Sequence, residues 1–376
     1  MSEKLLKIDK IIFISALLMM GFGIVFVYSS SFALAQVRHG GSYFYLLNHI
    51  IRVLIALCCL VFFINVDYHV LGKYSSILYI FAVCLLVYTL TIPDEEAVNG
   101  AKRWINLGLF RIQVSEFARI ILILSLAYQL EKQADHLHMV GVFILHVFRI
   151  GLICFLIILE PDFSTALVIG MISFCLLFIA GAKMSHLTSF LVSLIPFIVL
   201  TILNSTYRFN RLIAHFNFQD HTQGTGYQTF QALVGLGNGG FFGTGLGLGE
   251  QKYFYLPEPH TDFVFSILGE EIGFSGLLIV FAVFLILVYR GMRISFKAPD
   301  KMGHFLAFGL TLMMSCYFLL HSFVNTGIVP ITGVPLPFLS YGGMSLIFTM
   351  SSIGIILNIS SQTKIAHVPL KKRRKT

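Results

Sequence analysis

The sequence predicts an all-α, polytopic membrane protein with about ten transmembrane helices in a single domain over residues 1–376. The first observation is composition, since 57% of the residues are hydrophobic and only 12% are charged. A mean hydropathy of +0.84 is far too apolar for one soluble domain of this length. The second is a series of apolar runs of about 20 residues, the length that crosses roughly 30 Å of hydrocarbon. The third is an uneven distribution of lysine and arginine between the connections.

Ten apolar runs follow one another along the chain. They cover about residues 11–32, 46–65, 74–92, 113–131, 139–159, 162–181, 186–204, 262–289, 303–324 and 344–361. An even number of spans places both termini on one side of the membrane. Of the 26 Lys and Arg residues, 16 lie in segments on that side, which the positive-inside rule identifies as cytoplasmic. The basic tail over 362–376 is expected to anchor this topology, with binding of anionic lipid as the alternative.

Seven basic residues are expected on the opposite side, against the topology rule. They are Arg38, Lys102, Arg103, Arg111, Arg208, Arg211 and Lys252. Three extracytoplasmic segments there are long and polar, at about 93–112, 205–261 and 325–343. Because binding residues gather on loops that a scaffold positions, we expect function at this face. The large loop 205–261, between the seventh and eighth spans, is expected to fold over the outer mouth of the bundle.

Several other patterns indicate no site. The basic start of the chain and its first apolar run imitate a cleaved signal peptide, but the run is long and further spans follow at once, so an uncleaved first helix is expected. All six cysteines lie in apolar runs and the thirteen histidines show no ligand spacing, so no metal site is predicted. The run Gly235 to Gly240 spells G-x-G-x-x-G outside the context of a dinucleotide site. Its glycines are expected to allow tight turns and close approach of the backbone to a large ligand.

A cationic and aromatic group follows the third predicted span. Lys102 and Arg103 precede Trp104, the only tryptophan of the chain. A tryptophan at the membrane interface is by default a membrane anchor. This one can also stack on a sugar while the two cations meet phosphate, so both interpretations stay open.

Acidic residues mark the starts of the fourth and sixth spans. Ser115 and Glu116 open the fourth span, where helix capping and a role in an active site fit the pattern equally well. Asp162 opens the sixth span and is a candidate cap for the free N–H groups there. With Glu160 two residues earlier, it also suggests a polar cavity rather than lipid.

The segment from Lys252 to Phe263 leads directly into the eighth span and contains Asp262 at the membrane surface. A carboxylate there is partly desolvated, so its pKa is expected to rise towards the range of a general base. A simple helix cap is the competing interpretation, since aspartate caps helices well.

Two further acids, Glu270 and Glu271, lie about 12 Å deeper along the same predicted helix at 1.5 Å per residue. Intramembrane acids are candidates for function. Pairing with Arg119 or Arg52 inside the bundle is the structural alternative.

These segments, in this order, resemble the SEDS family of FtsW, RodA and SpoVE. The resemblance is carried by NGAKRWI, QVSEF, EPDFSTA, GYQ at 226–228, the glycine run, KYFYLPEPHTDF with ILGEE, and GVPLPFLSYGG. Each motif is short, but together they extend in order over about residues 100–345 and are specific. The resemblance implies one SEDS-type membrane domain for the whole chain.

The resemblance also implies a peptidoglycan glycosyltransferase that polymerises lipid II at the outer face of the bacterial cytoplasmic (inner) membrane. The family's proposed catalytic aspartate corresponds to Asp262, and its motif glutamate to Glu116, the second catalytic candidate. The residues expected to bind substrate come from the matching motifs and the outer cations. They are Lys102, Arg103, Trp104, Arg208, Arg211, Gln228, Lys252, His260 and Ser340.

The chain departs from the family pattern at several motif positions. Val114 stands where the family usually has proline, Arg119 lies near an expected lysine, Ser164 replaces a common glycine and Met344 a usual serine. The changes at Val114 and Ser164 are expected to alter backbone or packing more than chemistry. Activity is therefore still expected.

The expected mechanism is a single inverting displacement. Asp262 takes the proton from an acceptor sugar hydroxyl, which attacks the anomeric carbon of the lipid-linked donor, and undecaprenyl pyrophosphate leaves. The outer cations stabilise the leaving group. No cofactor is required, although a divalent cation that bridges the pyrophosphate would serve the same end. The implied partners are a class B penicillin-binding transpeptidase and other divisome proteins, and no nucleic acid is expected.

Three alternatives compete with an FtsW-like enzyme at the division septum. HTDF followed by GEE looks closer to FtsW, which leaves RodA-like elongation of the side wall as the nearest alternative. A lipid II flippase predicts ionisable residues at the midplane and internal repeats, and no convincing repeat is found. A non-catalytic divisome scaffold predicts that Asp262→Asn is tolerated, because asparagine caps helices equally well.

Overall fold

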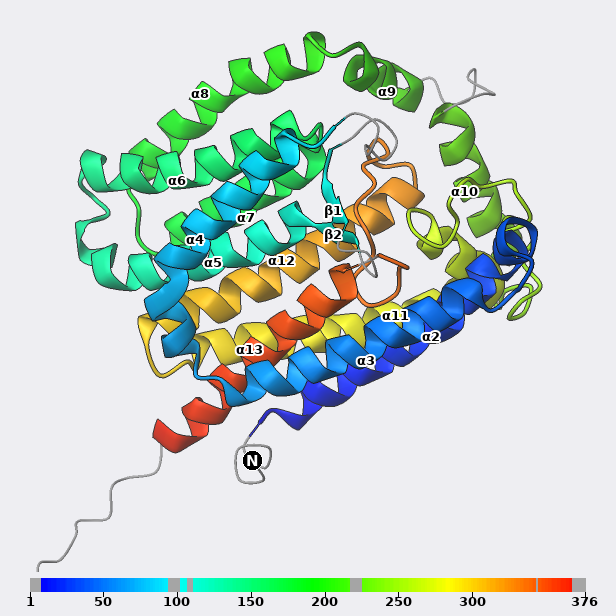
Figure 1. The fold of residues 1–376 in the computed structure, drawn as a ribbon, viewed down its shortest axis with the longest axis horizontal. Helices are drawn as coiled ribbons and strands as arrows, with labels where there is room; N and C mark the ends of the chain where they lie inside the picture. The colour runs from blue at the N-terminus through cyan, green and yellow to red at the C-terminus, as the bar shows by residue number, and fades with distance from the viewer. Residues whose placement is uncertain (1–7, 94–101, 107–110, 217–224, 343, 367–376) are drawn as a thin grey trace, which may run out of the picture.

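The chain folds into a bundle of long helices with one small β-hairpin, as the ribbon in Figure 1 shows. The structure is a computed structural model and describes residues 8–93, 102–106, 111–216, 225–342 and 344–366. The helices are α2 (Lys10–His39), α3 (Phe44–Asn65), α4 (Tyr68–Leu90), α5 (Val114–Gln133), the 3-10 turn η2 (Ala134–His136), α6 (Val140–Leu159), α7 (Phe163–Ile179), α8 (Met184–Leu203), α9 (Thr206–Phe216), α10 (Thr225–Gly239), α11 (Val264–Phe296), α12 (Lys301–Asn325) and α13 (Ser345–Ala366).

Each of the ten predicted spans lies on one of these helices. In the described part of the chain, eight helices are long and apolar enough to cross a membrane by length and composition. They are α2, α3, α4, α6, α8, α11, α12 and α13. Of the other two, α7 has only 17 residues, and α5 carries charges such as Glu116 and Arg119. The chain is therefore a multi-pass membrane protein, as predicted, while the number of helices that cross remains a prediction.

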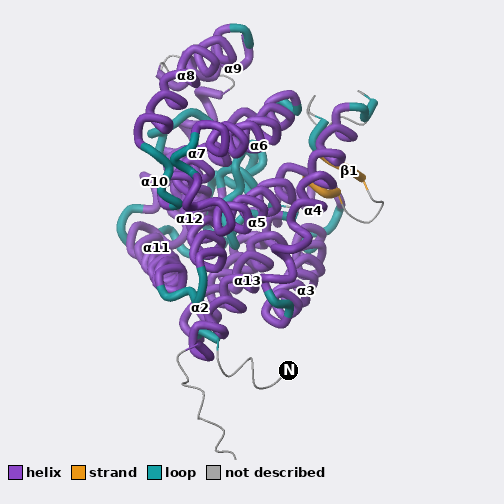
Figure 2. Tube along the Cα trace, turned by 90° about the vertical axis from the view of Figure 1, so that its left-hand side faces the viewer, coloured by secondary structure: helices purple, strands orange, loops and turns teal. Residues whose placement is uncertain are grey.

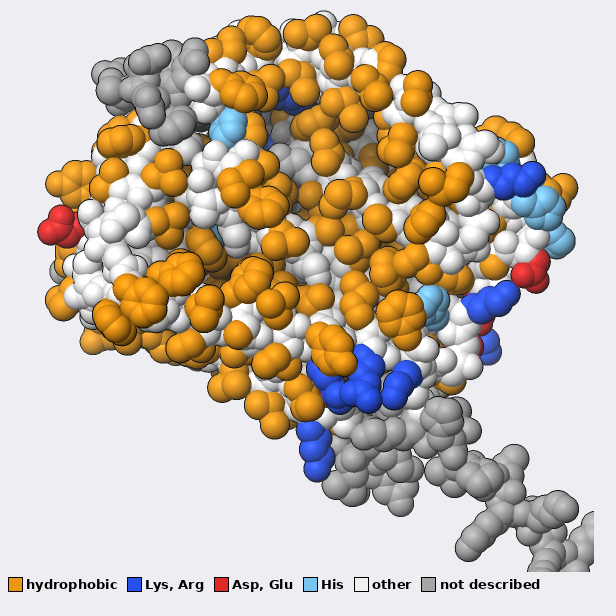
Figure 3. Space-filling view, turned by 180° about the vertical axis from the view of Figure 1, so that it is seen from behind, with side chains coloured by type: hydrophobic (Ala, Val, Ile, Leu, Met, Phe, Trp, Pro, Cys, Tyr) orange, Lys and Arg blue, Asp and Glu red, His pale blue; other side chains and the backbone are white. Residues whose placement is uncertain are grey.

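The outer surface agrees with a lipid environment. Figure 3 shows hydrophobic side chains over most of one face, with Lys and Arg gathered close to where the chain ends leave the bundle. The first and last described helices, α2 and α13, begin and end at that same side (Figure 1). That both termini lie on one side of the membrane remains a prediction. That this side is cytoplasmic remains a prediction from the distribution of basic residues.

The centre of the bundle is formed by α12 and α13. In their most apolar stretches, 72% of the residues of α12 and 83% of those of α13 are buried, whereas the value for α8 is 6%. Helix α8 contacts α7 and α9 and lies at the rim, as Figures 1 and 2 show from two directions. The two C-terminal helices therefore lie in the buried core, to which α8 contributes little.

Aspartate side chains begin several helices, because a carboxylate can accept the free N–H groups of the first turn. The caps are Asp9 in α2, Asp67 in α4, Asp162 in α7 and Asp300 in α12. The prediction that Asp162 caps its helix is confirmed, since it accepts from the N–H of Thr165 at 3.3 Å. The cap predicted for Ser115 is wrong, because the cap position of α5 is Gln113 and no side chain caps it.

The large loop before α11 contains two helices, α9 and α10, and the glycine run. Helix α11 is interrupted inside the bundle at Gly273, whose φ of 67° lies in the left-handed region. Four backbone hydrogen bonds from the glycine run satisfy the groups that this break exposes. They join the N–H groups of Thr244, Gly245, Phe274 and Ser275 to the carbonyls of Glu270, Glu271, Gly240 and Phe241, respectively, at 2.9, 3.0, 3.0 and 3.0 Å.

The glycines of this run are required by close backbone contact. A Cβ at Gly239 would lie 1.9 Å from the carbonyl oxygen of Gly269, and one at Gly243 would lie 2.2 Å from that of Glu271. The predicted close approach therefore exists at these two positions, but its target is the interrupted helix α11 rather than a ligand.

A two-stranded hairpin connects α4 to α5 on the outer side. Strands β1 (Trp104–Asn106) and β2 (Arg111–Gln113) pair antiparallel, with Trp104 opposite Gln113. The N–H of Val114 also donates to the carbonyl of Arg103 at 3.3 Å, which ties the hairpin to the start of α5. The sequence did not predict these strands, because three residues are too few to show an alternating pattern.

Candidate active site

Asp262 lies two residues before α11, and its backbone is held by the end of α12. The side-chain amide of Asn325 donates to the Asp262 carbonyl at 3.0 Å, and its oxygen accepts from the Ser266 N–H at 3.1 Å and hydroxyl at 2.8 Å. The cap position of α11 is Phe263, and no side chain caps this helix. The interpretation of Asp262 as a simple helix cap is therefore wrong. Among the described residues, its carboxylate makes no hydrogen bond.

The surroundings of Asp262 tune it as a proton acceptor. Burial raises the pKa of Asp262 to about 6, repulsion from Glu258 acts in the same direction, and the nearby Arg211 guanidinium opposes both. A Cβ added at Gly333 would lie 3.9 Å from Asp262 Oδ2, so a backbone without a side chain faces the carboxylate. An unbonded carboxylate with a pKa near neutrality is suited to general-base catalysis.

The loop after α12 is fastened to the segment that carries Asp262. The hydroxyl of Ser340 donates to the Thr261 carbonyl at 2.9 Å and accepts from the Leu336 N–H at 2.8 Å. The Tyr341 N–H donates to the His260 carbonyl at 2.8 Å. Ser340 is 4% exposed. Its hydroxyl holds the two loops together, and its contact with substrate remains a prediction.

His260 packs inside the same junction. Its ring lies between those of Tyr45 and Tyr341, with centroid distances of 4.7 and 5.3 Å. Burial lowers the pKa of His260 to about 4, so the imidazole is neutral at pH 7. The residue is 2% exposed and packs beside Asp262, and its contact with substrate remains a prediction.

Two of the predicted outer cations converge on the turn before α7. Arg103 donates from Nε to the Glu160 carbonyl at 2.8 Å, and its Nη1 lies 3.9 Å from Asp162 Oδ2. The guanidinium of Arg208, on α9, lies 5.4 Å from the ring of Phe163. Burial lowers the pKa of Arg208 and repulsion from Arg103 lowers it further, so the two cations are close together. Such a pair favours an anion between or beside them.

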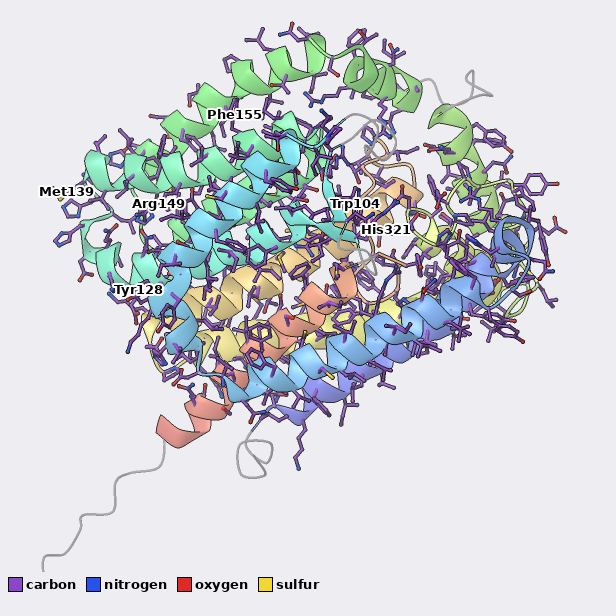
Figure 4. The ribbon with its side chains drawn as sticks, in the orientation of Figure 1. Trp104, Tyr128, Met139, Arg149, Phe155 and His321 are labelled. Carbon is purple, nitrogen blue, oxygen red and sulfur yellow. The ribbon has the colours of Figure 1, made fainter. Side chains whose placement is uncertain are left out.

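Lys102 and Trp104 lie on either side of Arg103 at the start of the hairpin, and both are partly exposed. Figure 4 shows Trp104 on the hairpin between α4 and α5. The fold thus brings the three residues of this motif to the turn formed by Glu160 and Asp162. Whether Trp104 stacks on a sugar remains a prediction.

Glu116, the second catalytic candidate, lies inside the bundle. It is 3% exposed, and its Oε2 is 2.5 Å from Nη2 of Arg119. The Arg119 guanidinium in turn lies over the ring of Tyr317, 4.1 Å from its centroid. The structure therefore places Glu116 in a buried ion pair behind the hairpin, where it is suited to position other groups.

The sequence of the chain is similar to those of known proteins. The family model of FtsW, RodA and SpoVE, described as cell cycle proteins, matches residues 9–365. The chain belongs to this family. A probable peptidoglycan glycosyltransferase FtsW of Geobacter sp. (strain M18) is 37% identical over 358 residues, which cover 95% of this chain and 97% of that protein. Stage V sporulation protein E of Bacillus subtilis is 36% identical over 367 residues, covering 97% and 100%.

Solved structures share the fold. A chain of a peptidoglycan synthase complex described for its coordination of polymerization and crosslinking superposes with a TM-score of 0.79 at 24% identity, and the match covers 95% of this chain and 98% of that one. The rod shape determining protein RodA of Thermus thermophilus superposes with a TM-score of 0.70 at 24% identity, covering 94% and 96%. The all-α membrane fold expected for this family is confirmed.

Lys252, predicted to bind substrate, is enclosed in the protein. It is 1% exposed, and its Nζ lies 2.6 Å from Glu271 Oε1 and 5.0 Å from the centroid of the Phe32 ring. The Ser29 hydroxyl donates to the same carboxylate at 2.6 Å. This ammonium neutralises a buried acid, and its predicted contact with substrate remains a prediction.

The partners predicted for the two deep acids are also wrong. Glu271 pairs with Lys252. Glu270 accepts hydrogen bonds from backbone N–H groups of the segment that follows the glycine run, here called the glycine loop, rather than from Arg119 or Arg52. The bonds to Glu270 come from Glu250 at 2.8 Å and Gln251 at 3.2 Å. Both acids therefore stabilise the loop against the interrupted helix and do not line a path across the membrane.

Gln228, on α10, lines a separate open pocket of about 290 Å³. Its wall also contains Arg38, which forms a salt bridge of 3.2 Å with Glu258. Since Glu258 also repels the Asp262 carboxylate, this pocket lies on the same side as the candidate base. Contact between Gln228 and a substrate remains a prediction.

Asn325 and Gly333 were not recognised in the sequence as parts of the site. Asn325 carried a signal in the sequence, since a polar side chain ends an apolar helix there. The structure shows that this side chain is fully buried, which requires hydrogen-bond partners. Gly333 carried none, because its role depends on which residue faces it across the fold. Among the described residues, no three His, Cys, Asp or Glu side chains gather as a metal-binding group.

Proposed function

We propose that this chain is a peptidoglycan glycosyltransferase that polymerises lipid II at the outer face of the bacterial cytoplasmic membrane. The observation that carries the proposal is the Asp262 carboxylate, which caps no helix, has a pKa raised to about 6 and faces the backbone of Gly333. Relatives named peptidoglycan glycosyltransferase FtsW match nearly the whole chain and support the same reaction class.

In the proposed mechanism, Asp262 accepts the proton of an acceptor sugar hydroxyl as that oxygen attacks the anomeric carbon of the donor. The bond between that carbon and the pyrophosphate breaks, the configuration inverts, and undecaprenyl pyrophosphate leaves. Because pyrophosphate is a good leaving group, a second protonated carboxyl is less necessary than in glycoside hydrolysis. One base and a set of cations are sufficient for this chemistry.

Arg103 and Arg208 are the best-placed cations for the pyrophosphate, since their mutual repulsion is relieved when an anion binds. Lys102 is adjacent in sequence, and Arg211 lies near the base itself. A divalent cation that bridges the pyrophosphate would add to the same stabilisation. Glu116 acts in this proposal as a positioning residue through Arg119, because its carboxylate is buried in that ion pair.

Relatives named FtsW support an FtsW-like role at the division septum as the proposal, with RodA-like elongation as the alternative. A class B penicillin-binding transpeptidase and other divisome proteins are the proposed partners. The structural neighbour from a peptidoglycan synthase complex supports an assembly of this kind. A flippase is less well supported, because the two deep acids are satisfied by Lys252 and by backbone N–H groups.

The test uses the purified full chain in nanodiscs with its transpeptidase partner and fluorescent lipid II. Glycan strands resolved by electrophoresis are the expected product. Proteoliposomes that move fluorescent lipid II between leaflets without forming polymer would instead identify a flippase. A protein that is folded by its thermal transition, yet neither polymerises nor moves lipid II, would support the scaffold.

A further inference from the structure

Arg149 places a positive charge halfway along a strongly apolar helix. It lies halfway along α6 (Val140–Leu159), at about 14 Å from the first residue and about 15 Å from the last, at 1.5 Å per residue. Helix α6 is a candidate span, and its most apolar stretch has a mean hydropathy of 2.7. A charged residue at this depth is costly and indicates a function and a partner.

No acid of the described chain neutralises Arg149. Among the residues that the structure describes, the neighbour of its guanidinium that can carry a negative charge is Tyr79 on α4, and this hydroxyl is protonated, because it donates to the Arg149 carbonyl at 2.8 Å. Arg149 Nη1 has no hydrogen-bond partner among the described residues. His146, one turn earlier, is fully buried and likewise has no partner on either ring nitrogen.

Arg149 lies on the side of α6 that contacts α4, since the Tyr79 hydroxyl of α4 donates to its carbonyl, and Figure 4 labels its side chain. Arg149 is only partly buried, and Leu145, four residues earlier on the same side of α6, is 42% exposed. On α4, Ser76 lies one turn before Tyr79 and is exposed. A small polar residue beside an intramembrane cation is typical of surfaces where transmembrane helices associate.

We propose that the surface where α4 and α6 meet at Arg149 binds a transmembrane helix of another protein that carries a carboxylate at the membrane midplane. A phospholipid headgroup is a poor occupant, because it lies at the membrane surface, about 14 Å away at 1.5 Å per residue of α6. A second copy of this chain does not provide the charge either, since the intramembrane acids Glu116, Glu270 and Glu271 are all buried. Charge complementarity therefore selects a different, acidic helix. This inference does not rest on the proposed enzymatic activity.

The test measures photo-crosslinking between the full-length protein in nanodiscs and a synthetic transmembrane peptide. The peptide is a leucine and alanine helix of about 20 residues with one central aspartate, and matched peptides carry asparagine or leucine there. A photoreactive amino acid replaces Leu145, which lies one turn before Arg149 on the same side of α6. A second protein carries it at Phe155, which is 50% exposed but lies about 120° away around α6, from six residues at 100° each.

Crosslinking at Leu145 is expected to be at least about fivefold stronger for the aspartate peptide than for the leucine peptide, and weak at Phe155. Arg149→Leu should abolish this preference, and Arg149→Lys should keep it. Ser76→Phe should reduce crosslinking, because it puts a large side chain on the exposed face of α4 where the peptide would bind. Arg149→Leu is expected to fold, because an apolar side chain replaces an uncompensated charge. Its thermal transition serves as the control.

Four results would overturn the proposal. Equal crosslinking of the aspartate and leucine peptides would show that the charge is not recognised. A preference that persists in folded Arg149→Leu would place the recognition elsewhere. A preference that disappears when zwitterionic lipid is replaced by anionic lipid would show that headgroups reach and neutralise Arg149. Crosslinks between two copies of the protein without peptide would show that the occupant is a second copy of this chain.

Discussion

Replacing Lys252 by methionine tests the buried ion pair that fastens the glycine loop to α11. The substitution keeps most of the apolar stem and removes the ammonium 2.6 Å from Glu271, where both side chains are fully buried. Breaking a buried pair from one side costs about 3–5 kcal/mol. We therefore expect Lys252→Met to destabilise the protein by about 3–4 kcal/mol.

The double variant Lys252→Met with Glu271→Met is the matched control. With both charges removed, its stability should return to within about 1 kcal/mol of wild type. Unfolding by SDS in mixed micelles measures both differences, and lipid II polymerisation measures activity at matched folding. A single variant as stable as wild type would refute the ion-pair account. A stable double variant with a strongly raised KM would instead restore Lys252 as a substrate ligand.

Three further predictions follow from the same structure. Gly243→Ala should destabilise the protein by more than about 2 kcal/mol in the same SDS titration, because its Cβ would clash with a backbone oxygen and its φ is 83°. The control is Gly237→Ala, which should be tolerated because the space around that position is open. Asn325→Ala should cost about 1–3 kcal/mol and lower kcat, because the Asp262 carbonyl and Ser266 lose their partner. Since the base must be ionised, kcat/KM should fall roughly tenfold between pH 7 and pH 5 for a pKa of about 6. Glu258→Gln removes a repulsion that raises this pKa, so the acidic limb of the pH profile should move to lower pH, and an unmoved limb would contradict the assignment.

The helices could be predicted because the membrane imposes their length and composition. Each apolar run of the sequence coincides with a helix, since a backbone in hydrocarbon must satisfy its own hydrogen bonds. The break at Gly273 was not predicted, because the groups that satisfy its backbone come from the glycine run, about 30 residues earlier in the sequence. The hairpin was missed for a local reason, as its strands have only three residues each.

The candidate site was predicted in part. Asp262 was recognised from its motif and its place before an apolar run, but its freedom from capping required the geometry of Phe263 and Asn325. A list of outer cations could not show that Arg103 meets Arg208 while Lys252 is buried against Glu271. Charge and sequence position indicate which side of the membrane a residue is on. Burial and pairing depend on contacts between distant segments.

The most direct test of the central claim compares wild type with Asp262→Asn in lipid II polymerisation, with each protein in complex with its transpeptidase partner. Asparagine keeps the shape of the side chain and removes its ability to accept the proton. We expect the variant to keep the unfolding midpoint of wild type and to lose polymerisation by about 10²–10⁴-fold, the usual contribution of a general base. Equal amounts of glycan polymer from the two folded proteins would contradict the assignment of Asp262 as the base.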